Sequence, residues 1–133
     1  MKVIFDSNIW VSFLIGHRLK DMRGILNNAA VEVYCCPQLV AEVMEVVGRE
    51  KIRKYVTHAE AADLLRIMRA YCHSVELTHE ADSLVRDPKD LYLLSLAETV
   101  GADYLVSGDA DLLVLGNHKS TRLVKFSEFR NIV

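Results

Sequence analysis

The chain has 133 residues and a formal net charge of −2, and 51% of its residues are hydrophobic, 26% charged and 8% aromatic. This length and composition fit one globular domain over residues 1–133 and leave little room for a second. No apolar run approaches the roughly 20 residues of a membrane span, and no signal-peptide pattern opens the chain, so we expect a cytoplasmic protein without a membrane partner. The near-neutral charge neither indicates nor excludes nucleic-acid binding.

Short apolar runs alternate with helical patterns along the chain. Residues 2–5 predict a buried strand and residues 8–15 a helix. The next predicted elements are a helix over 21–30, a strand over 31–36, a helix from Pro37 to Gly48, a helix over 58–71, a strand over 72–77, a helix that begins at residues 87–90 and ends near Gly101, and strands over 103–106 and 121–125. This alternation predicts an α/β domain with a central, mainly parallel sheet between helices.

Two aspartates follow predicted strands directly. Asp6 comes after the first strand, and Asp109 follows the strand over 103–106 through a turn at Gly108. In a parallel sheet ligands bind outside the carboxyl ends of the strands, which makes both residues site candidates. Each is equally suited to cap a helix or to form a turn. Asp111 is a weaker candidate, because it also fits as the N-terminal charge of a short helix through Leu115.

Two further acids lie near the apolar faces of predicted helices. At 100° per residue, Glu42 borders the buried face of the helix after Pro37, whereas Glu45 points to solvent. Asp90 lies on the apolar face of its helix, where a carboxylate is costly unless it is paired, hydrogen-bonded or bound to a metal. Two alternatives stay open: Glu42 is an ordinary solvated glutamate, and Asp90 forms a capping box with Asp87.

Several acids that converge without a basic partner repel one another unless divalent cations complete the site. Ligands that are all oxygen favour Mg²⁺ or Mn²⁺ over Zn²⁺, and such a cluster suits two-metal hydrolysis of a phosphodiester. The chain has no G-x-S-x-G nucleophile elbow and no Gly-rich phosphate loop. Its five histidines show no ligand spacing, and we expect them to be structural or on the surface. The cysteines fit best as small buried hydrophobes, Cys35 and Cys36 in particular.

In this order, Asp6, Asn8, Glu42, Asp90 and Asp109 resemble the PIN domain family, in particular the VapC-like ribonuclease toxins of toxin-antitoxin pairs. The resemblance spans nearly the whole chain. The segments that carry it are Val3-Ile4-Phe5-Asp6-Ser7-Asn8, the Glu42 helix, Arg86-Asp87-Pro88-Lys89-Asp90, and Tyr104-Leu105-Val106-Ser107-Gly108-Asp109-Ala110-Asp111-Leu112-Leu113. Family members often have threonine where Ser7 and Ser107 stand, and serine keeps the hydroxyl.

The resemblance implies a three-layer α/β/α fold and an endoribonuclease that depends on Mg²⁺ or Mn²⁺, often a homodimer held inactive by a cognate antitoxin protein. It assigns metal binding and catalysis to Asp6, Glu42, Asp90 and Asp109, with Asn8 and Ser107 as supporting polar residues. Asp87 and Asp111 complete the supporting set, and it stays open which of Asp87 and Asp90 faces the metal.

Without the four metal-site acids the formal net charge is +2, which fits an RNA substrate. Two basic clusters are candidate phosphate contacts: Arg49, Lys51, Arg53 and Lys54, and His118, Lys119, Arg122, Lys125 and Arg130. Solvated surface charge explains either cluster equally well. Ile9, Trp10 and Phe13, with Leu19 and Met22, form either a dimer or antitoxin surface or simply part of the core.

Two other functions compete with a nuclease. Aspartate-nucleophile phosphohydrolases also place an Asp after the first strand, but their second Asp, two residues on, is Asn8 here. The general acid of that reaction is then missing. The other alternative is a PIN-fold module that binds RNA or a protein partner without activity, and the presence of all four acids argues against it.

Overall fold

The computed structural model describes residues 1–81 and 87–133. Its strands are β1 (Lys2–Phe5), β2 (Glu32–Cys35), β3 (His73–Ser74), β4 (Tyr104–Val106), β5 (Asn117–His118) and β6 (Thr121–Val124). Its helices are α1 (Ser7–Ile15), α2 (Leu19–Leu26), α3 (Pro37–Val47), α4 (Glu50–Arg53), α5 (His58–Tyr71), α6 (Pro88–Val100), α7 (Ala110–Leu113) and α8 (Phe126–Ile132). None of these helices is long and apolar enough to cross a membrane.

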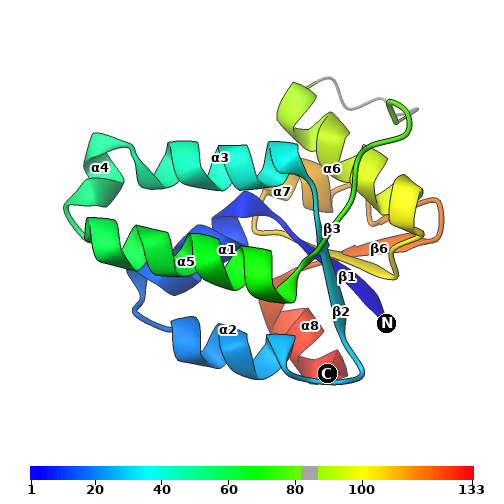
Figure 1. The fold of residues 1–133 in the computed structure, drawn as a ribbon. Coiled ribbons are helices and arrows are strands. Elements are labelled where there is room, and N and C mark those ends of the chain that lie inside the picture. Colours follow the sequence, from blue (N-terminus) through cyan, green and yellow to red (C-terminus); the bar gives the residue numbers. More distant parts are fainter. Residues whose placement is uncertain (82–86) are drawn as a thin grey trace.

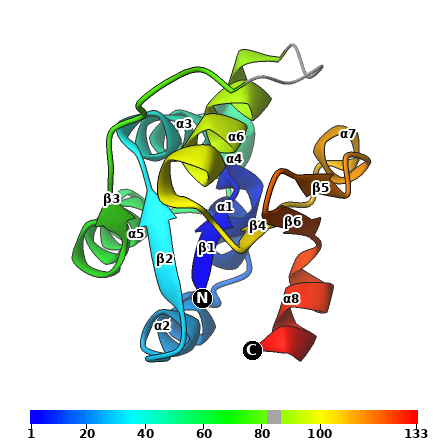
Figure 2. The same ribbon diagram turned by 90° about the vertical axis from the view of Figure 1, so that its right-hand side faces the viewer.

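The strands form one sheet in the order β3-β2-β1-β4-β6-β5, which Figure 2 shows side by side. All neighbouring pairs are parallel except β5 with β6, so the predicted mainly parallel sheet is confirmed. From β1 the chain builds outward through β2 to β3, and it then returns to the other side of β1 to form β4. The direction of building therefore reverses between β1 and β4, which is where ligands bind in open α/β sheets.

Helices cover both faces of the sheet, as the sequence predicts. In Figure 1, α1, α3 and α5 lie to one side of the strands, and α6 lies on the other. Helix α1 packs against α3 and α5, and α6 packs against β1. The crossovers explain this division, because right-handed connections that run in opposite directions along a sheet place their helices on opposite faces. Helices α3 and α5 run alongside each other and are joined at their far end by α4 (Figure 1).

The central strand β1 is buried because neighbours cover it on every side. Val3, Ile4 and Phe5 are fully buried, and the ring of Phe5 packs edge-on against Trp10 of α1 and Phe129 of α8, with centroids 5.7 and 5.6 Å apart. The indole N–H of Trp10 donates to the Phe5 carbonyl at 3.1 Å, which satisfies its polar atom inside the core. This packing fixes the end of β1, from which Asp6 emerges.

The apolar residues of α1 belong to the core. Ile9, Trp10 and Phe13 are buried within the chain, as is Met22 of α2, and Leu19 is partly buried against the same core. Core packing is therefore the confirmed interpretation of these side chains, and a dimer or antitoxin surface built on them is wrong. Cys35 and Cys36 are likewise buried, as predicted.

Several predicted boundaries differ from the structure. Helix α2 ends at Leu26 rather than at residue 30, because Asn28 forms a turn in which its side-chain oxygen accepts from the amide of Ala30 at 2.9 Å. The strand predicted over 72–77 pairs only at His73–Ser74, since this edge position has one neighbouring strand. The sequence patterns did not predict α4, β5 or α8.

Candidate active site

Asp6 occupies the turn between β1 and α1, where it is both helix cap and buried acid. Its Oδ1 accepts from the Ser7 amide at 2.6 Å and from the Ser7 hydroxyl at 3.3 Å. Its Oδ2 accepts from Ser107 Oγ at 2.7 Å and from the Asn8 side-chain amide at 3.3 Å. Burial raises the pKa of Asp6, and the charge of Glu42 adds to this effect, while the bonds from Ser107 and Ser7 oppose it.

A hydrogen-bond network joins the end of β4 to the end of β1. Beyond its bond to Asp6, Ser107 Oγ accepts from the amide of Asp109 at 3.0 Å. Asn8 Oδ1 accepts from the amide of Gly108 at 3.1 Å, and a side chain at Gly108 would contact Asn8. The backbone also connects the two strand ends, since the Asp6 amide donates to the Val106 carbonyl at 2.9 Å. Asp6, Asn8, Ser107 and Asp109 therefore gather at the switch point of the sheet.

Glu42 reaches the same region from the second turn of α3. Its side chain is only 11% exposed, in keeping with the predicted border position. The Tyr92 hydroxyl of α6 donates to Glu42 Oε2, and burial together with this bond raises the pKa of Tyr92 far above its ordinary value. Lys89 Nζ lies 3.9 Å from Glu42 Oε1. Lys89, the residue before Asp90 in the sequence, thus partly offsets the charge of Glu42.

Asp90 points inward from the first turn of α6 and is buried, as the helical wheel predicts. Burial is the main reason that its pKa rises to about 6, and the charges of four acids add to it: Asp109, Asp87, Asp6 and Glu42. Acids from four separate segments therefore act on one carboxylate. This convergence is the principal electrostatic feature of the site.

The remaining predicted residues have peripheral positions. Asp87 is exposed and caps α6 by accepting from the Lys89 amide at 3.0 Å; in the described residues Asp90 does not complete a reciprocal capping box. Asp111 is exposed in the first turn of α7, and its amide donates to Asp109 Oδ1 at 3.0 Å. Arg86, which opens the quoted Arg-Asp-Pro-Lys-Asp segment, lies outside the described residues.

Sequence reasoning missed Tyr92 and Lys89 as part of the site. Lys89 could have been predicted, because it is adjacent in sequence to the site candidate Asp90. Tyr92 is one of several polar residues of α6, and its partner Glu42 lies 50 residues away, so the local sequence does not mark it. Ser7 is a third member, through its two bonds to Asp6.

The chemistry of the donors fits a hard divalent cation. The acids, the serine hydroxyls and the Asn8 amide offer oxygen ligands, which favour Mg²⁺ or Mn²⁺ over Zn²⁺. A single lysine beside Glu42 leaves the cluster with a net negative charge. Within residues 1–81 and 87–133, no three acidic, histidine or cysteine side chains stand in a ready-made coordinating geometry.

A cleft of about 570 Å³ opens from the acidic cluster between α1 and α3. Asn8, Glu42 and Lys89 line its end at the cluster, and Gly16 and Arg49 are also among its lining residues.

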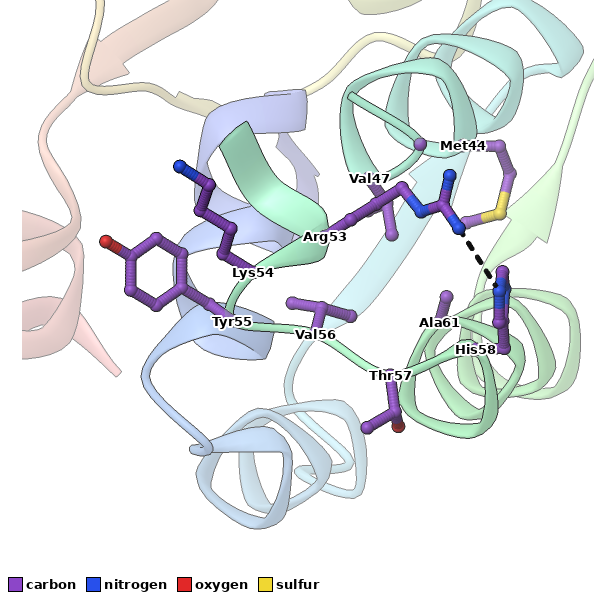
Figure 3. A pocket seen from close by; sticks show the side chains of 10 residues that line it. Met44, Val47, Arg53, Lys54, Tyr55, Val56, Thr57, His58 and Ala61 are labelled. Atoms are coloured by element: carbon purple, nitrogen blue, oxygen red, sulfur yellow. Dashed lines mark hydrogen bonds between the residues drawn. The ribbon is translucent and has the colours of Figure 1, made fainter. Parts of the chain in front are cut away.

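A second pocket of about 590 Å³ lies at the corner of α3, α4 and α5 and contains none of the acids. Figure 3 shows that its Arg53 points toward His58, whereas Lys54 and Tyr55 extend to the opposite side.

Part of the second basic cluster has an internal role. His118 donates through Nε2 to Glu98 Oε2 at 2.7 Å, and Lys119 Nζ donates to Oε1 at 2.5 Å. His79 also bonds to this carboxylate, whose side chain is only 4% exposed. Burial alone would raise the pKa of Glu98, but the three donors outweigh it and hold that pKa at about 2. His118 and Lys119 thus serve to neutralise a buried acid, and His79 and His118 are structural histidines, as expected.

Acids gathered at the point where the strand order of a parallel α/β sheet reverses define a ligand-binding site of acidic character. The comparisons with known proteins assign the family. A model of the PIN domain matches residues 2–111, and the chain belongs to the PIN domain family. No curated protein matches the chain.

Two solved structures share the fold at low sequence identity. The first is VapBC2 from Rickettsia felis bound to a DNA fragment from their promoter, with a TM-score of 0.64 and 15% identity over 95% of this chain and 99% of that chain. The second is the T. brucei RRP44 PIN domain, with a TM-score of 0.52 and 20% identity over 97% of this chain and 78% of that chain. Together with the family match, they confirm the predicted PIN-like fold.

Proposed function

We propose that this protein is an endoribonuclease that hydrolyses RNA phosphodiester bonds with the help of Mg²⁺ or Mn²⁺. The observation that carries the proposal is the convergence on Asp90, whose pKa is raised by burial and by the charges of four other acids. The PIN domain family is typically one of metal-dependent nucleases, which agrees with this site.

The four acids share one task in this proposal, and the residues around them have another. Asp6, Glu42, Asp90 and Asp109 bind the cations. Ser107 and Asn8 hold the Asp6 carboxylate through hydrogen bonds and so fix the direction of its oxygens. Tyr92 orients Glu42 through its hydrogen bond, and Lys89 lies near enough to pair with it electrostatically. When bound, a pair of divalent ions would activate a water molecule and stabilise the leaving oxygen of the phosphodiester.

The test is cleavage of a structured RNA pool by the purified protein in Mg²⁺, in Mn²⁺ and with a chelator. Glu42→Gln should lower the ion-dependent rate more than about a hundredfold, because even the partners of metal ligands are worth 10–100-fold. Glu32→Gln is the matched control, since Glu32 is an exposed glutamate at the start of β2, away from the carboxyl ends of the strands where the acids lie. The quadruple variant without Asp6, Glu42, Asp90 and Asp109 reports contaminating nuclease.

Calorimetry with each ion separates the outcomes. Cleavage that needs the ion and disappears in the Glu42 and quadruple variants supports the nuclease. Metal binding without cleavage of any RNA contradicts the proposed activity on this pool and points to a narrow target. No cleavage together with no metal binding refutes the proposal in favour of the inactive binding module. The phosphohydrolase is disfavoured by Asn8, whose amide serves as a structural link between Asp6 and Gly108.

We further propose that the nuclease is the toxin of a toxin-antitoxin pair and acts as a homodimer in the cytoplasm. The support is the similarity of fold to VapBC2. Induced expression in a bacterial host should arrest growth, whereas Asp6→Asn should not. Equal growth with both proteins would contradict the toxin assignment, and a monomer in sedimentation analysis would contradict the dimer.

A further inference from the structure

The cleft between α1 and α3 is lined at regular helical intervals. Glu42 and Val46 are four residues apart and share one face of α3, and Arg49, just past the end of this helix at Val47, lines the same cleft. Asn8, Ser12 and Ile15 have the same spacing on α1. Since α1 packs against α3, the two facing helices form the walls of one continuous cleft.

The cleft is acidic at one end and has a cation farther along. Glu42 lies seven residues before Arg49, and α3 ends at Val47 between them; at 1.5 Å per residue the helical part alone accounts for about 8 Å, so the two residues are on the order of 10 Å apart along the helix direction. The guanidinium of Arg49 is half-exposed and bonded only to the exposed Glu45, at 3.3 Å, within the described residues. Such a surface pair contributes little and is readily exchanged for another anion. Arg49 is therefore available to a ligand that follows the cleft.

On this basis, and given the proposed ribonuclease, we propose that the α1/α3 cleft is the track of a single-stranded RNA and that Arg49 binds one of its phosphates. A stacked strand advances about 3.4 Å per nucleotide, so the phosphate at Arg49 is about three nucleotides from the bond at the acids. The charge pattern of the cleft favours RNA as the occupant. At the acidic end, bound cations would screen the negative phosphodiester chain from the carboxylates. Farther along the cleft, the phosphates need a positively charged side chain, which Arg49 supplies.

The exposed aromatic residue after α4 lies at the second pocket, a few residues along the chain from the cleft. Tyr55 is 62% exposed and lies six residues beyond Arg49, beside Lys54. Figure 3 shows both side chains on the side of α4 away from Arg53 and His58. An aromatic ring next to a lysine is a platform on which a base can stack while the backbone is held by charge. We assign Tyr55 to a base beyond the Arg49 phosphate.

The test compares Arg49→Ala with Lys51→Ala. Lys51 carries the same charge as Arg49 and lies two residues farther along the chain, but its exposed side chain does not line the cleft. Binding of a fluorescein-labelled single-stranded RNA pool is measured by anisotropy on the Asp6→Asn background with chelator present. Arg49→Ala should raise Kd about tenfold, or about 1.4 kcal/mol. It should also reduce the slope of log K against log salt by about 0.7. Lys51→Ala should leave both nearly unchanged.

Kinetics on the protein without the Asp6 substitution give a second readout. Arg49→Ala should raise KM about tenfold and leave kcat within about twofold, because Arg49 is distant from the reacting phosphate. Tyr55→Ala should weaken binding of single-stranded RNA more than of a duplex, since only unpaired bases can stack on it. Tyr55→Phe should restore binding.

The outcomes of this test separate the track from the nuclease. Equal effects of Arg49→Ala and Lys51→Ala on Kd and salt slope overturn the track even if the protein cleaves RNA. Selective weakening by Arg49→Ala in a protein that cleaves nothing supports the track and refutes the nuclease. No RNA binding, with binding of an acidic peptide that Arg49→Ala abolishes, overturns the track and makes the cleft a protein-binding site.

Discussion

Replacing Asp90 by asparagine should stabilise the metal-free protein, although it removes a residue that we assign to the active site. Asp90 is buried among other acids, and its pKa of about 6 stands about two units above the ordinary value. At 1.36 kcal/mol per unit, its ionisation costs the folded state about 3 kcal/mol at neutral pH. Asparagine has nearly the same shape and carries no charge, so this cost disappears.

One effect opposes this gain. Asp90 lies in the first turn of α6, where a negative charge interacts favourably with the helix dipole by about 0.3–1 kcal/mol. The net gain is then about 2 kcal/mol. For a chain of this size, each kcal/mol moves Tm by about 3–4 °C, which gives an increase of about 7 °C. The assay is thermal unfolding in a chelator at pH 7.5.

The pH dependence tests the cause of the gain. The folded-state pKa of Asp90 is raised, so the penalty is complete above pH 6, decreases as the carboxyl is protonated and vanishes below the unfolded value near 4. The difference in Tm between the variant and the parent should therefore shrink from pH 7.5 to pH 4. Added Mg²⁺ should raise the Tm of the parent and not that of the variant. At a Mg²⁺ concentration a hundred times the Kd of the site, the parent should gain about 2.7 kcal/mol of unfolding free energy.

Asp111→Asn is the matched control, because Asp111 is an exposed aspartate in the first turn of another helix. Its stability should stay within about 0.5 kcal/mol of the parent. If Asp90→Asn has the same or a lower Tm than the parent at pH 7.5, the charge-repulsion account of the site is refuted. A difference in Tm that does not change between pH 7.5 and pH 4 would refute the titration of Asp90 as its cause.

Three further predictions concern other hydrogen bonds. Glu98→Gln should lower the free energy of unfolding in urea by about 2 kcal/mol at pH 7, because a neutral amide replaces the carboxylate that accepts from Lys119, His118 and His79. Since the pKa of Glu98 is about 2, the difference from the parent should vanish as pH falls from 4.5 toward 2, and a constant difference would contradict this. Ser107→Ala should slow RNA cleavage 10–100-fold by releasing Asp6, while Ser107→Thr should keep the rate; equal rates for both would contradict the role of the hydroxyl. Thr57→Ala should cost about 1 kcal/mol by removing the cap of α5, yet leave cleavage unchanged, as urea unfolding and the cleavage assay can check.

The parts of the fold that local patterns encode were predictable from the sequence. Helix α5 has the predicted limits of 58–71, because Thr57 and Glu60 form a capping box at its start. The wheel placed Asp90 inward and Glu45 outward, and both lie there, because helical spacing alone decides which residues face the core. The order of strands and helices also followed from apolar runs and Pro and Gly positions.

What the sequence did not reveal depends on partners that are distant along the chain. Helix α8 contributes Phe129, whose ring packs on Phe5, but a seven-residue amphipathic segment has no distinctive pattern of its own. The bond from Tyr92 to Glu42 joins residues 50 positions apart, and the Glu98 cluster joins α6 to His79, which precedes it in the chain, and to the β5–β6 hairpin, which follows it. Such contacts arise only when the sheet has brought the segments together, so no local periodicity signals them.

The two buried glutamates of this chain show how differently it treats structural and candidate catalytic carboxylates. Glu98 has two histidines and a lysine around it, and these donors hold its pKa at about 2 without any ion from solution. Glu42 instead accepts from the neutral hydroxyl of Tyr92 and has one lysine at 3.9 Å. Asp6 likewise takes its bonds from neutral serine and asparagine groups. Neutral donors orient a carboxylate but leave its negative charge uncompensated, so the switch point keeps an electrostatic demand that a divalent cation would satisfy. A purely structural cluster would be more stable with positively charged partners like those around Glu98. The contrast between the two sites therefore favours the metal-dependent nuclease over the inactive module.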